Sequence, residues 1–146
     1  MMGIRAALLG ALLGLAACTG VFAPPYDPAV SDHAATAYGA AARLAAEIQL
    51  GQLSDPSSYA QTAPQYVSIM ADIAIAKQRA ASLPATTPVA KDAQQRLGQL
   101  LQGCADNAQL LAGIQQKSGI KPNVGADAAL MVSCDLAAKA AAALKP

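Results

Sequence analysis

Residues that usually carry catalysis or bind metals are scarce in this chain. It contains one histidine, His33, and one glutamate, Glu47, so it cannot build a multi-histidine metal site or the carboxylate-rich di-iron site of some helical bundles. The sequence also has no Cys-x-x-Cys-His haem signature, no Gly-x-Ser-x-Gly elbow and no glycine-rich phosphate loop. We therefore expect no catalytic residue, no metal site and no cofactor, and a protein that is not an enzyme.

Large apolar side chains are scarce as well. There is no tryptophan, Phe22 is the only phenylalanine, and alanine supplies much of the hydrophobic fraction. Alanine is the best helix former but buries little area, so a core made from it needs helices that approach closely. Alternating β-branched runs and Asn-Gly hairpin turns are missing, which argues against strands.

The charge is balanced. Of the ten Lys and Arg side chains, Arg5 lies before position 18, which leaves nine basic side chains to face nine acidic ones. This balance gives no electrostatic footprint for nucleic acid. From position 18 onward, no apolar stretch is long enough to cross a membrane.

The chain opens with the anatomy of a secretory signal. Arg5 is followed by a short run of Ala, Leu and Gly from residue 6 to residue 15, and the run ends in Leu15-Ala16-Ala17-Cys18. This ending resembles the lipobox of bacterial lipoprotein precursors. The resemblance ends at Cys18. It implies that residues 1–17 are removed and that Cys18 carries the lipid, with fatty acyl chains of the palmitate type on its thiol and amine.

The resemblance also implies a location. Thr19, rather than Asp, follows the cysteine, which resembles the signal for sorting to the outer membrane. Several acyl chains on one residue anchor a protein stably to a bilayer. The alternatives are an ordinary Cys18 after a conventional signal peptide, or a buried helix over residues 6–17. The first would leave an odd number of cysteines in a secreted chain.

Helix-start signals divide the rest of the chain. Three pairs place a capping side chain before a proline, namely Asp27-Pro28, Asp55-Pro56 and Thr87-Pro88, and Lys121-Pro122-Asn123 is a looser version. Stop signals follow at Gly51, Pro84 and Ser118-Gly119. We predict helices over residues 28–51, 57–83, 88–118 and 123–144. Pro64 predicts a loose first turn or a kinked beginning over residues 56–63.

Each predicted helix has an apolar seam with steps of three and four residues. With short connections, four such helices predict an all-α, antiparallel, up-down four-helix bundle over residues 28–146, after a tether over residues 18–27. The seams are Val30, Ala34, Ala37, Ala41, Leu44 and Ile48; Ile69, Ile73, Ala76, Ala80 and Leu83; Ala93, Leu97, Leu100, Cys104, Asn107, Leu111 and Ile114; and Leu130, Cys134, Ala137, Ala141 and Leu144.

Cys104 and Cys134 both lie on seams, and their midpoint is Gly119. In an antiparallel hairpin that turns at Gly119, the two thiols would face each other, and an exported protein meets an oxidising environment. We predict a disulfide, closing a loop of about 30 residues and stabilising the fold by roughly 3.6 kcal/mol in the chain-entropy model. The alternatives are two reduced core cysteines or a metal site, for which these helices offer no further ligand.

The remaining polar residues have structural interpretations. Asn107 lies on a seam and would set the register through a buried contact. Tyr38 and Tyr66 could line a small pocket, but tyrosine more often buries its ring and sends its hydroxyl to water. His33 is expected to be solvated. Three pairs four residues apart could form helical ion pairs: Arg43 with Glu47, Asp92 with Arg96, and Asp135 with Lys139.

These observations favour a lipid-anchored domain of the bacterial envelope that binds or scaffolds an unidentified envelope protein and has no catalytic role. One alternative is a module that binds a small apolar ligand in a cavity left by alanine-rich packing. A less favoured alternative is an envelope enzyme.

Overall fold

Four α helices make up nearly all of the part of the chain that the computed structural model describes, residues 26–122 and 125–144. They are α3 (Pro28–Gln49), α4 (Tyr59–Ser82), α5 (Pro88–Ser118) and α6 (Ala126–Ala142), and a short 3-10 helix, η1 (Pro56–Ser58), precedes α4. Over these residues no strand is present. The all-α prediction is confirmed.

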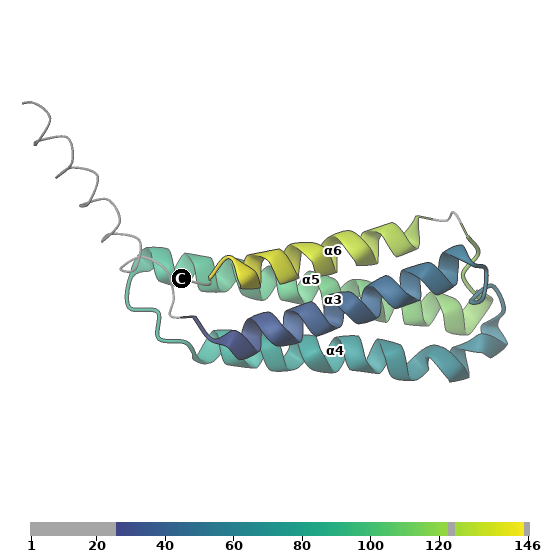
Figure 1. Cartoon of the computed structure of the whole chain (residues 1–146), viewed down its shortest axis with the longest axis horizontal. Coiled ribbons are helices and arrows are strands. Elements are labelled where there is room, and N and C mark those ends of the chain that lie inside the picture. The colour runs from purple at the N-terminus through teal and green to yellow at the C-terminus, as the bar shows by residue number, and fades with distance from the viewer. Residues whose placement is uncertain (1–25, 123–124, 145–146) are drawn as a thin grey trace, which may run out of the picture.

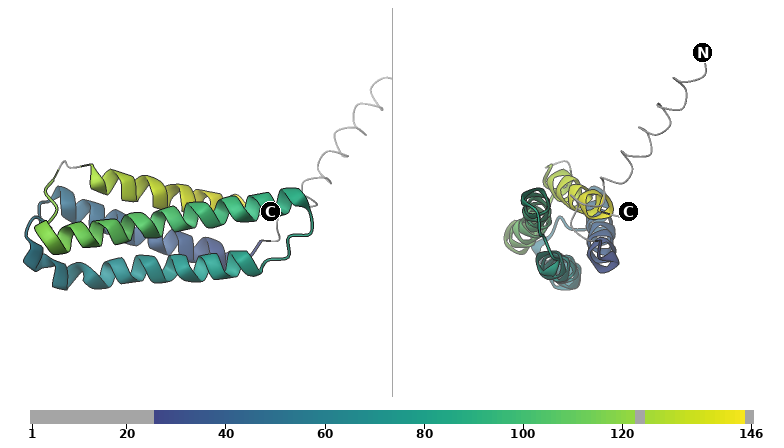
Figure 2. Two further views of the ribbon diagram at one scale, coloured as in Figure 1. Left: turned by 180° about the vertical axis from the view of Figure 1, so that it is seen from behind. Right: turned by 90° about the vertical axis from the view of Figure 1, so that its left-hand side faces the viewer.

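The helices form a closed ring. Each packs on the next in chain order, and α6 returns to pack on α3, so that the four rods run side by side along one long axis (Figures 1 and 2). Successive helices run in opposite directions, which confirms the up-down bundle. The start of α3, the 83–87 connection and the end of α6 lie together at what we call the terminal end. The α3–α4 and α5–α6 connections lie at the opposite loop end.

The predicted starts at Pro28 and Pro88 are confirmed for α3 and α5, and the start at Asp55-Pro56 begins η1, the short turn before α4. Asp27 accepts a hydrogen bond from the Ala29 amide at 2.9 Å, Asp55 from the Ser57 amide at 2.7 Å, and Thr87 from the Ala90 amide at 3.1 Å. Each of these residues is followed by a proline in the first turn. The fourth start is wrong, because α6 begins at Ala126. Its preceding residue, Gly125, has a φ of 76° and no capping side chain, and residues 123–124 lie outside the described residues.

The predicted loose turn before Pro64 is also wrong for most of its length. Residues 56–58 form η1, and α4 then runs without a break from Tyr59 through Pro64. Pro64 has no backbone N–H, so α4 loses only the one hydrogen bond that this N–H would have donated to the carbonyl one turn earlier. Thr62 stabilises the same turn, because its hydroxyl lies 3.3 Å from the carbonyl oxygens of both Ser58 and Tyr59.

The apolar seams are buried as predicted on α3 and along most of α4 and α6. On α5 the seam is rotated: Leu97, Cys104 and Leu111 are buried, but Asn107 is only half-buried and donates to the Gly103 carbonyl at 3.0 Å. The expectation of a buried, register-setting Asn107 is therefore wrong. Ala108, one helical turn after Cys104, is buried in place of Asn107. The buried stripe of α5 therefore includes Leu101, Ala108 and Gln115.

Candidate functional site

The predicted lipid site, Cys18, lies outside the described residues. Its attachment therefore stays a prediction. The nearest described element along the chain is α3, which begins at Pro28 at the terminal end.

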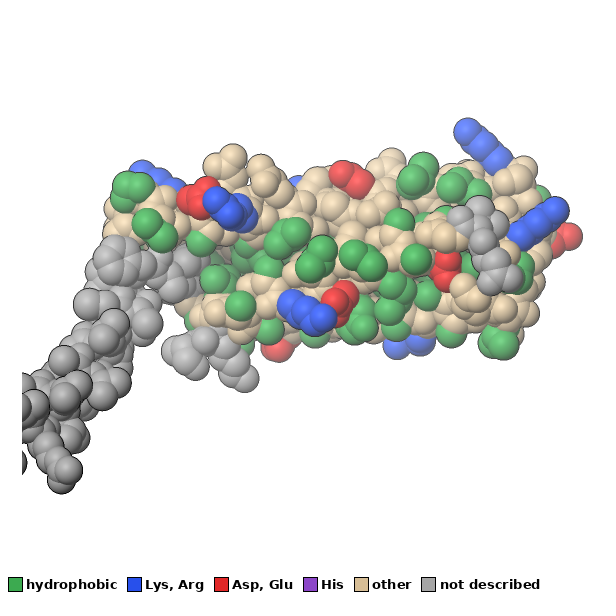
Figure 3. All heavy atoms as spheres, turned by 90° about the horizontal axis from the view of Figure 1, so that it is seen from above, with side chains coloured by type: hydrophobic (Ala, Val, Ile, Leu, Met, Phe, Trp, Pro, Cys, Tyr) green, Lys and Arg blue, Asp and Glu red, His purple; other side chains and the backbone are tan. Residues whose placement is uncertain are grey.

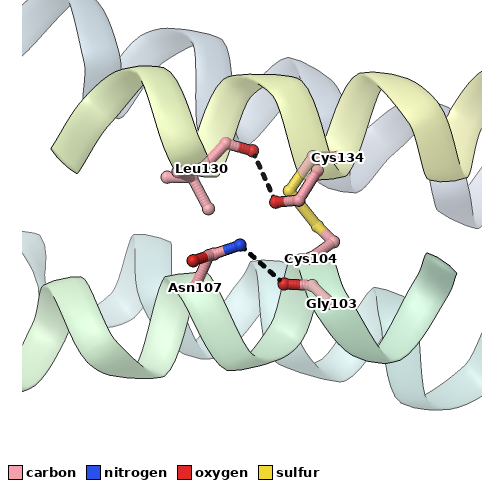
Figure 4. The surroundings of a disulfide bond; sticks show 6 residues. Gly103, Cys104, Asn107, Leu130 and Cys134 are labelled. Carbon is pink, nitrogen blue, oxygen red and sulfur yellow. Dashed lines mark hydrogen bonds between the residues drawn. A yellow bond between two sulfur atoms is a disulfide. The ribbon is translucent and has the colours of Figure 1, made fainter. Parts of the chain in front are cut away.

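Cys104 of α5 and Cys134 of α6 meet across the helix interface (Figure 4). Both are fully buried, their Sγ atoms are at disulfide distance, and their Cα atoms are 4.6 Å apart, which is inside the range a disulfide allows. Among the described residues, no three or more His, Cys, Asp or Glu side chains are grouped so that they could hold a metal ion.

The symmetric turn at Gly119 is not how the two cysteines come together. Cys104 is farther from Ser118, where α5 ends, than Cys134 is from Ala126, where α6 begins. From the helical rise per residue, α5 therefore extends about 9 Å beyond the start of α6, and the connection must run back over that distance. The pairing matches the prediction, but the turn is longer than the sequence indicated.

A buried polar network lies at the loop end, and its centre is Gln115, which is fully buried. The Gln115 Oε1 accepts from the hydroxyl of Tyr66 at 2.8 Å. The Gln115 Nε2 donates to the hydroxyls of Ser58 and Thr62 at 2.9 and 2.8 Å. The Ser58 hydroxyl donates onward to the carbonyl of Asp55 at 2.6 Å. Both ends of the buried amide are therefore satisfied, as burial of a polar group requires.

The network corrects the expectation for Tyr66. Its ring is buried, but its hydroxyl donates to Gln115 and does not reach water. Burial raises the pKa of Tyr66 above its ordinary value, with smaller contributions from Tyr59 and Glu47. Tyr38 is half-buried. Gln115 was missed in the sequence because a glutamine near a helix end resembles a surface residue. Its signal was the step of four from Leu111, a residue of the predicted seam.

Beside this network a polar pocket of about 230 Å³ opens between α3 and the start of α4. Glu47 lies on its wall and accepts a hydrogen bond from the Gln65 Nε2 at 2.9 Å. The Gln65 Oε1 is buried and has no hydrogen-bond partner among the described residues. We call this space the loop-end pocket, and its lining residues are Glu47, Gln52, Leu53, Ser58, Gln61, Thr62 and Gln65.

The two connections at the loop end are tied to each other. The Ile120 amide donates to the Leu53 carbonyl at 2.6 Å, and Gln49 of α3 donates to Asp127 of α6. Gly119 has a φ of 71°, and a Cβ there would collide with the backbone carbonyl of Ser54. This close backbone contact holds the α5–α6 connection against the α3–α4 connection, which forms one side of the pocket.

The ion pairs match the predictions in two of three cases. Asp92 pairs with Arg96 at 2.8 Å and Asp135 pairs with Lys139 at 2.7 Å. The predicted pair of Arg43 with Glu47 is wrong: the partner of Glu47 is Gln65 on the neighbouring helix.

His33 does not behave as a freely solvated side chain. Its Nδ1 lies 2.8 Å from the Asp72 Oδ1, which joins α3 to α4 towards the terminal end. The histidine side chain is 32% exposed and the aspartate side chain 17%. The pair is therefore an interhelical contact at the edge of the core, and His33 is partly solvated as well as bonded to Asp72, a contact that the sequence did not predict.

Charged side chains are dispersed along the outside of the bundle. On the face that Figure 3 shows, basic and acidic side chains are interspersed along its length, and hydrophobic side chains lie between them. The charge on this face is therefore as mixed as the sequence indicated.

No family model, no curated protein and no solved structure matches this chain. Across the described ranges, no helix is long and apolar enough to cross a membrane.

Proposed function

We propose that this chain is a lipoprotein of the bacterial cell envelope, attached through an acylated Cys18, whose helical bundle binds or scaffolds another envelope component and is not an enzyme. The attachment rests on Leu15-Ala16-Ala17-Cys18 after a short apolar run. Thr19 favours the outer membrane. The proposed partners are the membrane and an envelope protein that the sequence does not identify.

The orientation of the bundle relative to Cys18 supports the proposal. The chain enters α3 at the terminal end, and the segment from Cys18 to Pro28 can span at most about 35 Å. The 31 residues of α5 measure about 46 Å. A lipid on Cys18 would keep the terminal end close to the bilayer and leave the loop end, with its polar pocket, free to face outward.

A second candidate, binding of an apolar ligand between the helices, has less support. A hollow of about 410 Å³ is lined by Asp106, Gln109, Leu110, Gly113, Ile114 and Lys117. All of these belong to α5, so the hollow lies on the surface of one helix. The core between the helices contains fully buried apolar side chains such as Leu44, Ile69 and Leu101. A lipid that co-purifies with the chain at equal stoichiometry would favour this candidate.

Membrane fractionation tests the proposed anchor. Wild-type protein should remain with the outer membrane, and mass spectrometry should find a mature chain that begins at an acylated Cys18. Cys18→Ala should give an unprocessed or soluble product. The matched control, Cys104→Ala with Cys134→Ala, should stay in the membrane fraction. An unmodified amino terminus at another residue would contradict the proposal.

A further inference from the structure

The loop-end pocket offers a bound molecule more hydrogen-bond acceptors than donors. The hydroxyl protons of two lining residues are already committed, because Ser58 donates to the Asp55 carbonyl and Thr62 donates to a backbone carbonyl of the preceding turn. Each hydroxyl also accepts from Gln115. A hydroxyl has one proton and two lone pairs. These side chains can therefore offer a bound molecule only a lone pair.

Glu47 and Gln65 add further acceptors. An ionised carboxylate only accepts hydrogen bonds, and the bond from Gln65 uses a single oxygen of Glu47, Oε1. Among the described residues Glu47 has no cationic partner within ion-pair distance, although Arg43 is one helical turn away. Its carboxylate is therefore a negative charge on the pocket wall that no neighbouring cation neutralises.

The orientation of the Gln65 amide is determined by its neighbour. Turning the amide over would place its oxygen against the Glu47 carboxylate, so the nitrogen must face Glu47 and the oxygen must face away. That oxygen is the buried atom without a partner among the described residues. A buried carbonyl without a hydrogen bond costs free energy, and a ligand that supplies a donor would recover it. Gln65 is a lining residue of the pocket, and the last torsion of a glutamine is soft, so its amide can reorient when a ligand binds Glu47.

We infer that the loop-end pocket binds a primary ammonium group. Such a group has three N–H donors, no acceptor and one positive charge, which matches a lining with a carboxylate, an unpaired amide oxygen and two hydroxyl lone pairs. Gln52 and Gln61 are exposed at the rim and can turn either way. Leu53 is buried and supplies an apolar wall for an alkyl stem. The ammonium belongs either to a free alkylamine or to a lysine side chain of a partner.

This inference does not depend on the lipid on Cys18. Binding is measured on the purified full chain, so its failure would leave the fractionation result intact, and the reverse also holds. The probes are n-butylammonium, tetramethylammonium, and a blocked Gly-Lys-Gly peptide with a norleucine counterpart, each at the same ionic strength. Isothermal titration calorimetry gives the affinity, and amide NMR shifts locate the binding.

Butylammonium should bind with shifts confined to residues 47–65. Tetramethylammonium has the charge but no donor and should bind at least about tenfold more weakly. Glu47→Gln should weaken butylammonium binding by about tenfold or more. The matched control is Asp32→Asn, which removes the same charge from the same helix about 22 Å away, and it should leave binding unchanged. Gln65→Leu should also weaken binding, and circular dichroism should show that each variant is folded.

The two sources of the ammonium group give different results. If the lysine peptide binds more tightly than butylammonium and the norleucine peptide does not bind, the ligand is a lysine of a protein partner. If butylammonium binds more tightly, the ligand is a free amine. The inference is overturned if butylammonium does not bind, if tetramethylammonium binds equally well, or if folded Glu47→Gln binds like wild type.

Discussion

Gln115 holds three other side chains in place at the loop end, and at the residue scale it is the most constrained polar group of the described core. Its amide joins α5 to Tyr66 and Thr62 of α4 and to Ser58 of η1. A satisfied buried network contributes modestly to stability, but removal of one member leaves the others unpaired. The network therefore fixes the position of η1, and with it one wall of the loop-end pocket.

Replacement of Gln115 tests this role. Gln115→Leu should lower the free energy of unfolding by about 2–4 kcal/mol, because it leaves three hydroxyls without their buried partner. Tyr66→Phe should cost about 1–2 kcal/mol. In urea denaturation the double variant should lose less than the sum of the single variants, since both disrupt the same contact. Strict additivity would show that the Tyr66–Gln115 bond contributes nothing.

Asp55 predicts a pH dependence. The hydroxyl of Ser57, and then its backbone N–H, lower the pKa of Asp55 below its ordinary value of 3.8. A carboxyl with a lowered pKa in the folded state stabilises the fold at pH values above the unfolded pKa, and this contribution is lost as the pH falls through the folded pKa.

The stability difference between wild type and Asp55→Ala should therefore be constant near neutral pH and should shrink as the pH falls below about 4. Thr87→Ala is the matched control, because it removes a side-chain cap that does not titrate. It should cost about 1 kcal/mol at every pH. Urea denaturation from acid to neutral pH measures both. A difference for Asp55→Ala that does not change with pH would contradict the assignment.

At the element scale, the two glycines that end helices at the loop end have different roles. Gly51 and Gly119 both have positive φ angles, of 73° and 71°. A Cβ on Gly51 would make only ordinary contacts at 3.7 Å, whereas a Cβ on Gly119 would strike the backbone of Ser54. The first glycine is needed for its conformation alone, and the second is needed also for the close approach of two backbones.

Alanine substitution separates these roles. Gly51→Ala should cost about 1–2 kcal/mol, the ordinary penalty for a side chain in the left-handed region. Gly119→Ala should cost about 3 kcal/mol or more, because the strain and the collision add and neither backbone can move independently. Thermal unfolding followed by circular dichroism measures both. Equal losses would show that the 119–120 and 53–54 segments separate freely.

Some helix boundaries and faces could be predicted better than others, because some depend on neighbouring residues in the sequence and others on contacts between helices. Proline and a capping side chain are local, so the starts at Pro28 and Pro88 could be read directly. The start of α6 could not, since Gly125 has no side chain to cap a helix and its backbone angle is set by the connection. The rotation of the α5 seam and the burial of Gln115 depend on which helices lie on either side, and one helix's periodicity does not specify that.

The site was less predictable than the fold. The cysteine pair could be expected because both residues lie on apolar seams of consecutive antiparallel helices, although the symmetric turn assumed between them is not the one that forms. The loop-end pocket brings together residues from the end of α3 and the start of α4, which are polar and carry no recognisable motif in the sequence. Glu47 was assigned to Arg43 because a neighbour on the same helix was the only partner that the sequence offered. In the fold, Gln65 of the next helix donates the hydrogen bond to Glu47 instead.

At the scale of the whole molecule, the bundle combines an alanine-rich core with one covalent link. Many of the fully buried positions are alanines, such as Ala34, Ala37, Ala41, Ala76 and Ala137. Small side chains allow close helix approach but contribute little hydrophobic free energy each. A cross-link between α5 and α6 compensates for this by restricting the unfolded chain.

Reduction tests this compensation. Loss of the Cys104–Cys134 link should lower the free energy of unfolding by roughly 3.6 kcal/mol in the chain-entropy model for a sequence separation of 30, and the melting temperature should fall. Both thiols should resist alkylation until a reductant is added. Cys104→Ala with Cys134→Ala should reproduce the loss without adding reductant. A melting temperature that is the same in oxidised and reduced protein would contradict the role given to the link.

The same disulfide determines what happens to the protein after proteolytic cleavage between α5 and α6. In the α5–α6 connection Gly119 and Ile120 are buried, but Lys121 is exposed and belongs to no helix, and exposed connections are where proteases usually cut. A cut there would divide the chain into two pieces, but both would remain joined through Cys104 and Cys134. The carboxyl-terminal helix would stay attached to the rest of the bundle, and a nicked molecule would migrate as a single chain until it was reduced.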